Sequence, residues 1–289
     1  MTKNDTTWRF WIDRGGTFTD LIGVASDGRL VTRKLLSENP ERYEDAAIAG
    51  IKDVLYVAQT DPVPSGRVHS VRMGTTVATN ALLERKGTRT AFVTNRGLGD
   101  VLRIGTQARP QLFDLAITLP SMLYETVIEV DGRIGVDGTE ATPLDEKVAR
   151  AALDAARADG IEAVAIALMH GWKNPIHEER LSEIAREAGF TQVSASHVVS
   201  PLLRLVPRGD TTVVDAYLSP ILRRYVDQVS KSLDGIPLYF MQSHGGLAEA
   251  SSFQGKDAIL SGPAGGIVGA VRSAGCGRRA GSLRRSRNC

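Results

Sequence analysis

A ten-residue apolar run, IEAVAIALMH at residues 161–170, lies between two segments with helical spacing of apolar residues. Residues 143–160 precede it and residues 174–189 follow it, with Asn174 as the expected N-cap and Pro175 at the first helical position. A continuous apolar run of this length is typical of a strand that is buried on both faces of a parallel sheet. The run therefore predicts an α/β protein.

The first 36 residues predict a β-meander instead. Three apolar stretches, 8–13, 18–25 and 30–36, are separated by the tight-turn signals Gly-Gly and Ser-Asp-Gly. Later segments again alternate in type. Strands are expected at 68–76, 89–94, 191–196 and 236–242, helices at 43–57, 77–87 and 211–233, a loop at 103–121, and a strand turning into a small-residue helix at 257–274. The expected fold is α/β, with mostly parallel sheets after the meander.

The charge distribution separates the last residues from the rest. Residues 272–289 carry six arginines and no acid, whereas the preceding 271 residues carry 29 basic and 33 acidic side chains. This body gives no reason to expect nucleic-acid binding. No stretch approaches the ~18 apolar residues of a membrane span, and no secretory signal is visible. A cytoplasmic protein is the default expectation.

Glycines and polar side chains are densest in IDRGGTFTD, residues 12–20. Glycines let backbone N–H groups approach an anion without a Cβ in the way. Thr17 and Thr19 offer hydroxyl donors, and Asp13 is suited to holding a hydrated Mg²⁺ or to orienting a nucleophile. The hairpin tip therefore predicts a loop for nucleotide phosphates.

Two other interpretations of this tip remain open. Gly-Gly occurs in hairpin turns that bind nothing, and the carboxylates Asp13 and Asp20 also suit a glycosidase, although this is less attractive beside a phosphate-type turn. The tip is not a Walker A loop, because no Lys-Ser/Thr follows the glycines. It is not a dinucleotide fingerprint either, because no helix follows the turn.

Six motifs together make the sequence resemble the hydantoinase/oxoprolinase family: IDRGGTFTD, RMGTTVATNALLERKG, IGTQARPQLFDL, VPRGDTTVVDAYLSP, MQSHGGL and LSGPAGG. KLLSENP, IGTQARPQLFDL and VPRG are most similar to the ATP-dependent 5-oxoprolinase branch. The resemblance covers residues 8–274. It implies an actin/Hsp70/sugar-kinase-like (ribonuclease H-like) ATPase lobe. It also implies ATP-driven hydrolysis of 5-oxo-L-proline to L-glutamate, with Mg²⁺ and K⁺ as the expected ions. Phosphorylation makes the lactam oxygen a leaving group, so the enzyme acts by positioning and charge stabilisation.

The resemblance also assigns roles to single residues. Asp13, Gly15, Gly16, Thr17 and Thr19 match the first phosphate loop, with Asp13 as the catalytic and metal-binding carboxylate. Gly74, Thr75, Thr76 and Asn80 match an element expected to line the ATP cleft, with Asn80 catalytic; a strand-to-helix turn capped by Thr is the alternative. Arg103, Gln107 and Arg109 are candidates for binding a substrate carboxylate, and a solvated loop charge is the alternative for each.

The remaining titratable residues are expected to be structural or to lie on the surface. His170, His177, His197 and His244 share no metal-ligand spacing. His244 differs from the others because its SHGG turn is expected beside the cleft. Asp210 and Asp215, on one expected helix, predict a solvated or capping pair. Both cysteines, Cys276 and Cys289, lie in the basic tail, so the body has no disulfide framework.

The resemblance ends abruptly near residue 275. The family pattern continues from the small-residue helix into a strand and a second loop of the type GFDMGGTSTD, whereas this sequence continues GCGRRAGSLRRSRNC. The change favours a reading-frame error or a truncation, and a basic arm is the alternative. The expected domains are 8–205, 206–274 as the start of a second domain, and 275–289 as an aberrant tail.

This ending has consequences for activity and partners. Loss of a single preorganised donor costs roughly 3 kcal/mol in known cases, so a chain without the second loop is expected to show negligible turnover and to expose an apolar face. A homo-oligomer, or a complex with an oxoprolinase B-type chain or domain, is expected. The alternatives are a hydantoinase A-type subunit, of the N-methylhydantoinase or acetone carboxylase kind, and a non-catalytic fragment that binds a complementary chain.

Overall fold

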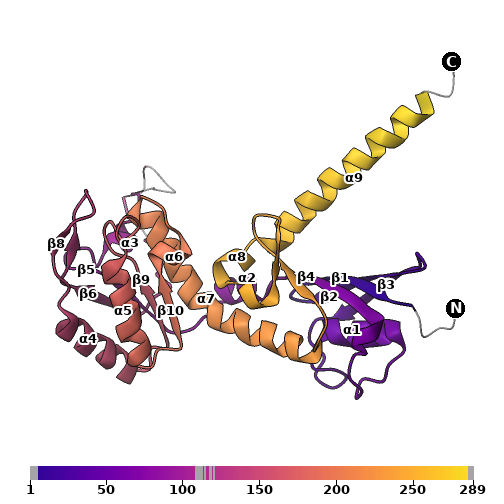
Figure 1. Cartoon of the computed structure of the whole chain (residues 1–289), viewed down its shortest axis with the longest axis horizontal. Coiled ribbons are helices and arrows are strands. Elements are labelled where there is room, and N and C mark those ends of the chain that lie inside the picture. The colour runs from indigo at the N-terminus through magenta and orange to yellow at the C-terminus, as the bar shows by residue number, and fades with distance from the viewer. Residues whose placement is uncertain (1–5, 108–112, 114, 117–118, 120, 286–289) are drawn as a thin grey trace. The chain divides into compact units, whose positions relative to one another are not determined.

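The computed structural model describes residues 6–107, 113, 115–116, 119 and 121–285, without the side chains of 275–285. The chain forms two compact units, of which one combines Met1–Asn80 with Leu222–Cys289 and the other is Ala81–Ile221 (Figure 1). This division differs from the linear one expected at residue 205. The chain leaves the first unit after Asn80 and returns at Leu222, and a strand from the returning segment then joins the first sheet.

A six-stranded sheet of order β12-β11-β4-β1-β2-β3 forms the first unit. Its first three strands are antiparallel neighbours and confirm the predicted meander: β1 (Trp8–Arg14), β2 (Phe18–Ala25) and β3 (Leu30–Leu36). The other strands are β4 (Val68–Thr75), parallel to β1, β11 (Leu238–Met241), parallel to β4, and the antiparallel edge strand β12 (Leu247–Glu249).

Helices meet both faces of this sheet. On one face lies α1 (Ala46–Leu55), which Asp45 caps by accepting the N–H groups of Ala47 and Ile48 at 2.8 and 3.1 Å. Leu21 of β2 packs directly against Gly50 of α1. The opposite face meets α9 (Ser261–Arg285), which contacts β4 and β11. Alternating residues of the strands therefore face two different helical surroundings.

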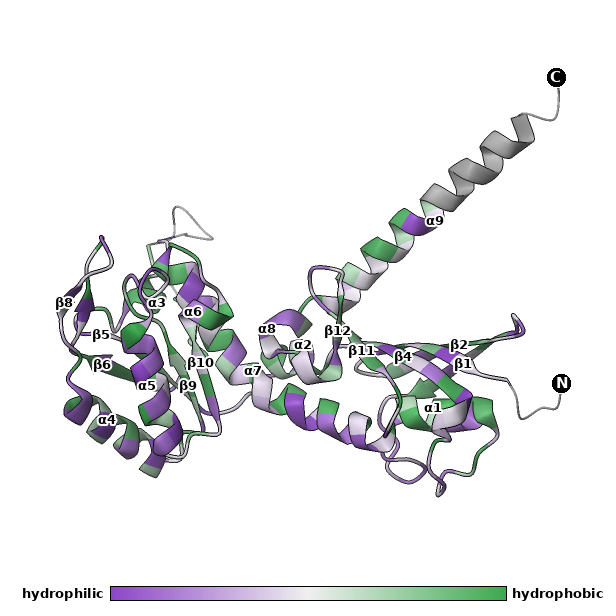
Figure 2. Cartoon of the chain, viewed as in Figure 1, coloured by the Kyte–Doolittle hydropathy of each residue, from purple (hydrophilic) through white to green (hydrophobic). Residues whose placement is uncertain are grey.

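The second unit contains a four-stranded parallel sheet of order β10-β9-β5-β6. Its strands are β5 (Thr90–Asn95), β6 (Thr126–Val130), β9 (Ala163–Ile166) and β10 (Gln192–Ala195). One face packs on α4 (Glu146–Ala158) and α5 (Ile176–Glu187), and the other on α3 (Val101–Ile104) and the first half of α7 (Leu205–Ser232). The strands are mostly hydrophobic (Figure 2), as the apolar run predicts.

Some elements differ from the sequence-based expectations. β9 takes only four residues of the apolar run, and α7 begins at Leu205 rather than at residue 211. No strand forms at the start of 257–274, where one was expected: Asp257 and Ala258 belong to α8 (Gly255–Ala258), and residues 259–260 form a turn. A short apolar run does not distinguish a strand from a helix. Pro175 rather than Asn174 is the N-cap of α5, although Asn174 Oδ1 still accepts the Ile176 N–H at 3.2 Å.

Several short elements complete the structure. The hairpin β7 (Arg133–Ile134) and β8 (Glu140–Thr142), α2 (Val77–Leu83) and α6 (Ser196–Val199) connect the larger elements. The sequence predicts α2 within a longer helix, but it gives no expectation for β6, β7, β8 or β12. Within the described ranges, no helix combines the length and apolar character that crossing a bilayer requires.

Candidate functional site

The phosphate loop, defined here as residues 13–19, forms the tip of the β1–β2 hairpin. The Gly15 N–H donates to Phe18 O at 3.0 Å and closes the turn. A Cβ on Gly15 would lie 2.8 Å from that same carbonyl oxygen, so the turn requires glycine. Gly16 and Thr17 are exposed, and no hydrogen bond among the described residues uses their N–H groups. The tip therefore presents two backbone donors to solvent.

The Gly-Thr-Thr element joins this loop through the parallel pairing of β1 and β4. Asp13 lies opposite Gly74, and a Cβ on Gly74 would approach Asp13 Oδ1 to 3.2 Å. Thr76 donates to Arg14 O with both its N–H, at 3.0 Å, and its hydroxyl, at 3.3 Å. A Cβ on Gly16 would lie 2.9 Å from Asn80 Nδ2. The structure thus brings Asp13, Gly16, Gly74 and Asn80 together.

The LSGPAGG motif contacts the same element. The Ser261 hydroxyl, at the start of α9, donates to Thr75 O at 3.0 Å, and the Thr79 hydroxyl donates to Ile259 O at 2.6 Å. The Thr75 hydroxyl, buried at the end of β4, accepts the Val77 N–H at 3.2 Å. One N–H group at the start of α2 is therefore bound by a threonine side chain of the strand that precedes it.

The SHGG turn lies beside α8 and the start of α9. The Ser243 hydroxyl donates to Asp257 O at 2.7 Å and accepts the Leu260 N–H at 3.1 Å. His244 Nδ1 accepts the Gly246 N–H at 3.2 Å, so the imidazole closes its own turn. The turn therefore contacts the start of the LSGPAGG motif through Ser243.

Two loop side chains point into the protein rather than outward. Thr19 is fully buried, and its hydroxyl lies 3.0 Å from that of Ser37. The Arg14 guanidinium stacks on the Tyr225 ring, 4.9 Å from its centroid, and its Nε lies 3.9 Å from Asp45 Oδ2. Burial and the Asp45 charge raise the pKa of Tyr225 well above its usual value. Thr19, expected to contact phosphate, therefore lies behind the loop.

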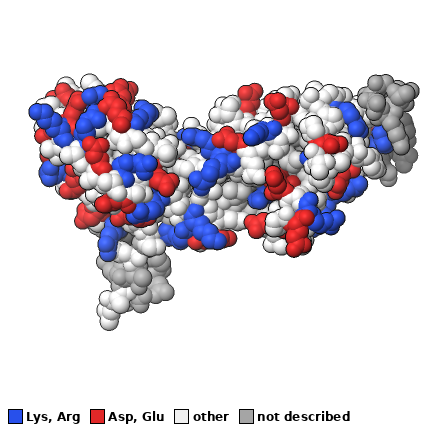
Figure 3. All heavy atoms as spheres, turned by 90° about the horizontal axis from the view of Figure 1, so that it is seen from below, with Lys and Arg blue, Asp and Glu red and all other residues white. Residues whose placement is uncertain are grey.

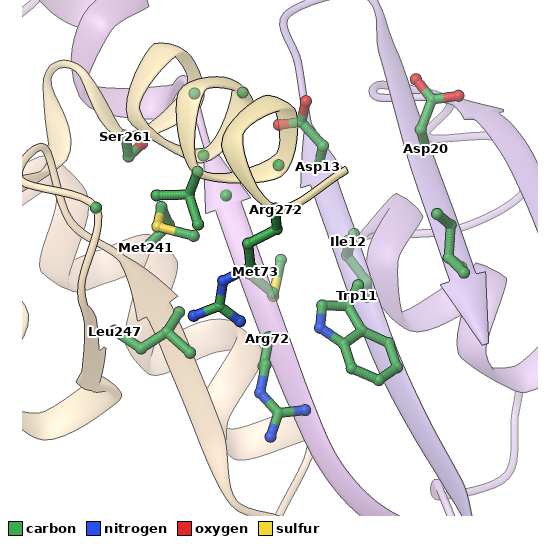
Figure 4. A pocket seen from close by; sticks show the side chains of 18 residues that line it. Trp11, Ile12, Asp13, Asp20, Arg72, Met73, Met241, Leu247, Ser261 and Arg272 are labelled. Atoms are coloured by element: carbon green, nitrogen blue, oxygen red, sulfur yellow. The ribbon is translucent and has the colours of Figure 1, made fainter. Parts of the chain in front are cut away.

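A groove of about 680 Å³ runs along the outer face of the sheet beneath α9. Asp13 lies at the end nearest the first turns of α9, while Trp11, Arg72 and Arg272 lie at the other end (Figure 4). Exposed apolar side chains line it: Trp11, Ile22 and Leu247. The expected apolar face is therefore present on this unit.

The candidate substrate residues fall in the second unit or outside the described residues. Arg103 belongs to α3, and its charge lowers the pKa of Tyr124, which burial raises more strongly. Gln107 has a positive φ of 58°. Arg109 lies outside the described residues.

Acidic and basic side chains are interspersed on the face seen in Figure 3.

A buried carboxylate, Glu178 on α5, is the hub of the second unit. Its Oε1 accepts the Leu168 N–H at 2.9 Å and the Ser196 hydroxyl at 2.6 Å. Its Oε2 accepts the His197 N–H at 2.9 Å and lies 2.8 Å from His197 Nδ1. The fully buried Arg208 donates to Leu202 O at 2.7 Å and to Leu168 O. The segment after β9 and the start of α6, which follows β10, are therefore both bound by the carboxylate of Glu178.

The sequence contains no sign of this network, because Glu178 is one of two adjacent glutamates on a helix that looks solvated. Burial lowers the pKa of Arg208, and the charge of Glu178 opposes that shift. Asp215 is also buried and accepts the hydroxyls of Ser194 and Ser219 at 2.7 and 3.0 Å. The solvated pair expected on α7 is therefore wrong for Asp215, whereas Asp210 is exposed.

The histidines of the second unit occupy structural positions. His177 is buried with Nε2 2.6 Å from Glu140 Oε1, and His170 Nδ1 lies 2.8 Å from Ile134 O. No group of three or more His, Cys, Asp and Glu side chains in the part that the structure describes is arranged to hold a metal ion. Any ion at Asp13 would therefore rely on oxygens from a ligand and water.

Comparisons with known proteins place these features in a wider group. Residues 9–189 match the family described as the hydantoinase/oxoprolinase N-terminal region, and residues 208–280 match the family described as hydantoinase/oxoprolinase. The chain is 43% identical to 5-oxoprolinase 1 of Arabidopsis thaliana over 293 residues, covering 90% of this chain and 23% of that protein.

Two further relatives are similar over most of this chain. Caprolactamase subunit alpha of Pseudomonas jessenii is 33% identical, over 89% of this chain and 38% of that protein. The nucleotide-free structure of acetone carboxylase, an enzyme of ATP-dependent acetone carboxylation, matches with a TM-score of 0.78 and 26% identity, over 92% of this chain and 40% of that one. The chain thus spans about a quarter to two fifths of the length of these relatives.

Proposed function

Because the chain belongs to the hydantoinase/oxoprolinase family, we propose that it forms a phosphate cradle of an ATP-dependent cyclic amide hydrolase that acts on 5-oxo-L-proline. The observation that carries the proposal is the glycine hairpin tip, whose free N–H groups lie beside Asp13 and Asn80. The similarity to 5-oxoprolinase 1 supports the choice of substrate.

The exposed residues at the tip of the loop are the phosphate donors in this proposal. The N–H groups of Gly16 and Thr17 donate to phosphate oxygens, and the exposed Thr17 hydroxyl adds a third donor. Asn80 Nδ2, next to Gly16, offers a fourth. Because the hairpin and the β4–α2 junction are joined through backbone bonds of Arg14 and Thr76, these donors are already in place before the nucleotide binds.

Asp13 is the residue that would hold Mg²⁺. Its carboxylate is exposed at the end of the groove, and the missing side chain of Gly74 leaves room beside it. A single carboxylate completed by phosphate oxygens and water is a donor set that Mg²⁺ accepts. The ion would reduce the negative charge of the phosphates. K⁺ remains an expectation from the family, with no ligands assigned to it.

The proposed reaction has two stages. The lactam oxygen attacks the γ-phosphorus, and the bond from that phosphorus to ADP breaks as the new P–O bond forms. Water then adds to the activated carbon, and the ring C–N bond breaks with a proton passing to nitrogen, which leaves an acyl phosphate. A second water hydrolyses this acyl phosphate and releases phosphate. The products are L-glutamate, ADP and phosphate. Donors aimed at the phosphate oxygens stabilise the charge that moves during the first stage.

Titration calorimetry with MgATP tests the nucleotide part of the proposal. Asp13→Asn is expected to weaken binding about tenfold or more, because a charged metal ligand is lost. Asp20→Asn is the matched control. Asp20 lies opposite Asp13 in the β1–β2 register, but its carboxylate forms an ion pair with Lys34 at 3.0 Å. Absence of saturable binding to the unmodified chain, or equal losses in both variants, would contradict the proposal.

A second candidate function is a hydantoinase-type alpha subunit that acts together with another chain. The similarity to a caprolactamase subunit supports it. Phosphate release from ATP, measured with the chain completed by a polypeptide that carries the second phosphate loop and by an oxoprolinase B-type chain, distinguishes the candidates. Stimulation by 5-oxo-L-proline supports the first, and stimulation only by a hydantoin or caprolactam supports the second.

A further inference from the structure

We infer that Ser37 is a positioning residue that directs the Gly16 N–H of the phosphate loop toward its ligand, an inference that rests on the function proposed above. Ser37 follows β3 and is only 3% exposed. Its hydroxyl donates to Gly15 O at 2.7 Å, and its N–H donates to Thr17 O at 2.9 Å. One residue outside the loop thus binds two of the loop's carbonyl groups.

The number of hydroxyl protons decides which side chain donates in the contact between Ser37 and Thr19. A serine hydroxyl has a single proton, and that of Ser37 is donated to Gly15 O. In the 3.0 Å contact between the Ser37 and Thr19 hydroxyls, Thr19 must therefore be the donor. The only proton of the Thr19 hydroxyl is used inside the protein. Thr19 acts on the loop through Ser37 rather than on a ligand.

Peptide geometry connects the Gly15 carbonyl to the donor at the tip. Among the residues that the structure describes there is no cis peptide bond, and in a trans peptide the C=O and the following N–H point in opposite directions. The hydrogen bond to Ser37 turns the Gly15 C=O inward, so the Gly16 N–H points outward. Glycine at both positions permits this peptide unit to rotate easily. The Ser37 hydroxyl is thus what opposes rotation of the peptide that carries the donor.

The test compares two variants that break the same hydroxyl pair. Ser37→Ala removes the Gly15 tether and the acceptor for Thr19, and is expected to weaken MgATP binding about tenfold in calorimetry. Thr19→Val breaks the pair but leaves the Gly15 tether, and is expected to weaken binding only about twofold while lowering the melting temperature comparably. Thr32→Ala, at an exposed position of β3, is the matched control and is expected to bind like the unmodified chain.

A third variant keeps the test decisive if Ser37→Ala does not fold. Ser37→Cys retains the size of the side chain with a weaker donor, and it is expected to bind MgATP more weakly than the unmodified chain at an unchanged melting temperature. Unchanged affinity in Ser37→Ala or Ser37→Cys, or equal losses in Ser37→Ala and Thr19→Val, would overturn the inference. Absence of MgATP binding by the unmodified chain would instead overturn the proposed function, and this inference with it.

Discussion

Replacement of Glu178 by glutamine is expected to destabilise the second unit strongly. The carboxylate accepts four hydrogen bonds, two on each oxygen, and one donor on each oxygen is a backbone N–H, from Leu168 or His197. A hydroxyl can rotate and an imidazole can change tautomer to accept from the new NH₂ group, but a backbone N–H cannot. Whichever oxygen becomes nitrogen, one buried N–H is therefore left facing another donor.

The size of the effect follows from these contacts. An unsatisfied buried donor costs about 1–3 kcal/mol, and each remaining bond loses the assistance of a charge. The buried Arg208 also loses the negative charge nearest to it, which adds to the cost. Together these effects are expected to lower the free energy of unfolding by about 3–4 kcal/mol. For a unit of this size, that corresponds to a fall in melting temperature of roughly 10 °C.

Urea unfolding followed by circular dichroism measures the loss. Glu179→Gln is the matched control, because Glu179 is the neighbouring residue on α5 and is exposed, and it is expected to change stability by less than about 0.5 kcal/mol. A Glu178→Gln variant as stable as this control would refute the reasoning. It would mean that the four contacts add no more stability than a solvated carboxylate does.

Three further predictions concern other parts of the molecule. Gly87→Ala is expected to lower stability by about 1–3 kcal/mol, because the new Cβ would lie 2.0 Å from the Tyr217 ring; an unchanged melting temperature would show that the ring moves freely. As pH rises past about 10, the unfolded chain loses the Tyr225 proton before the folded chain does, so the free energy of unfolding decreases. Tyr225→Phe removes this proton and is expected to reduce the decrease in the urea midpoint between pH 9 and 11. The same decrease in the variant and in the unmodified chain would contradict this prediction. Leu247→Ser is expected to reduce the fluorescence of a dye that binds the exposed apolar groove, whereas unchanged dye binding would place the apolar site elsewhere.

Local patterns were sufficient for the elements that carry the loop. The meander follows from alternation in β1 and β2 and from the Gly-Gly and Asp-Gly turns, and each of its strands lies within one or two residues of expectation. The same alternation already implied the position of Thr19. It shares a face of β2 with Leu21, and that face is buried. The hydroxyl chemistry of the motif suggested a phosphate ligand, but the strand period gives the side chain an inward direction.

These local patterns could not predict contacts between residues that are far apart in the sequence. Nothing local to Ser37 indicates that its hydroxyl reaches Gly15, because the contact depends on how β3 ends beside the hairpin tip. Glu178 and Glu179 look alike in sequence, and only the packing of α5 against β9 and β10 makes one of them a buried hub. The proximity of Asp13 and Gly74 likewise depends on strand pairing between distant segments, for which the family resemblance was a better guide than periodicity.

The discontinuous first unit affects how the protein is made. During synthesis, β1 to β4 leave the ribosome before the whole of the second unit, and the partner of β4 on its other side, β11, begins only at Leu238. At about 5–20 residues per second, the interval from Thr75 to Leu238 lasts roughly ten to thirty seconds. Throughout it the β4 edge has unpaired N–H and C=O groups that a neighbouring nascent chain can bind. The second unit, which is continuous in sequence, folds within that interval, so chaperone protection matters most for the four strands of the sheet that are made first.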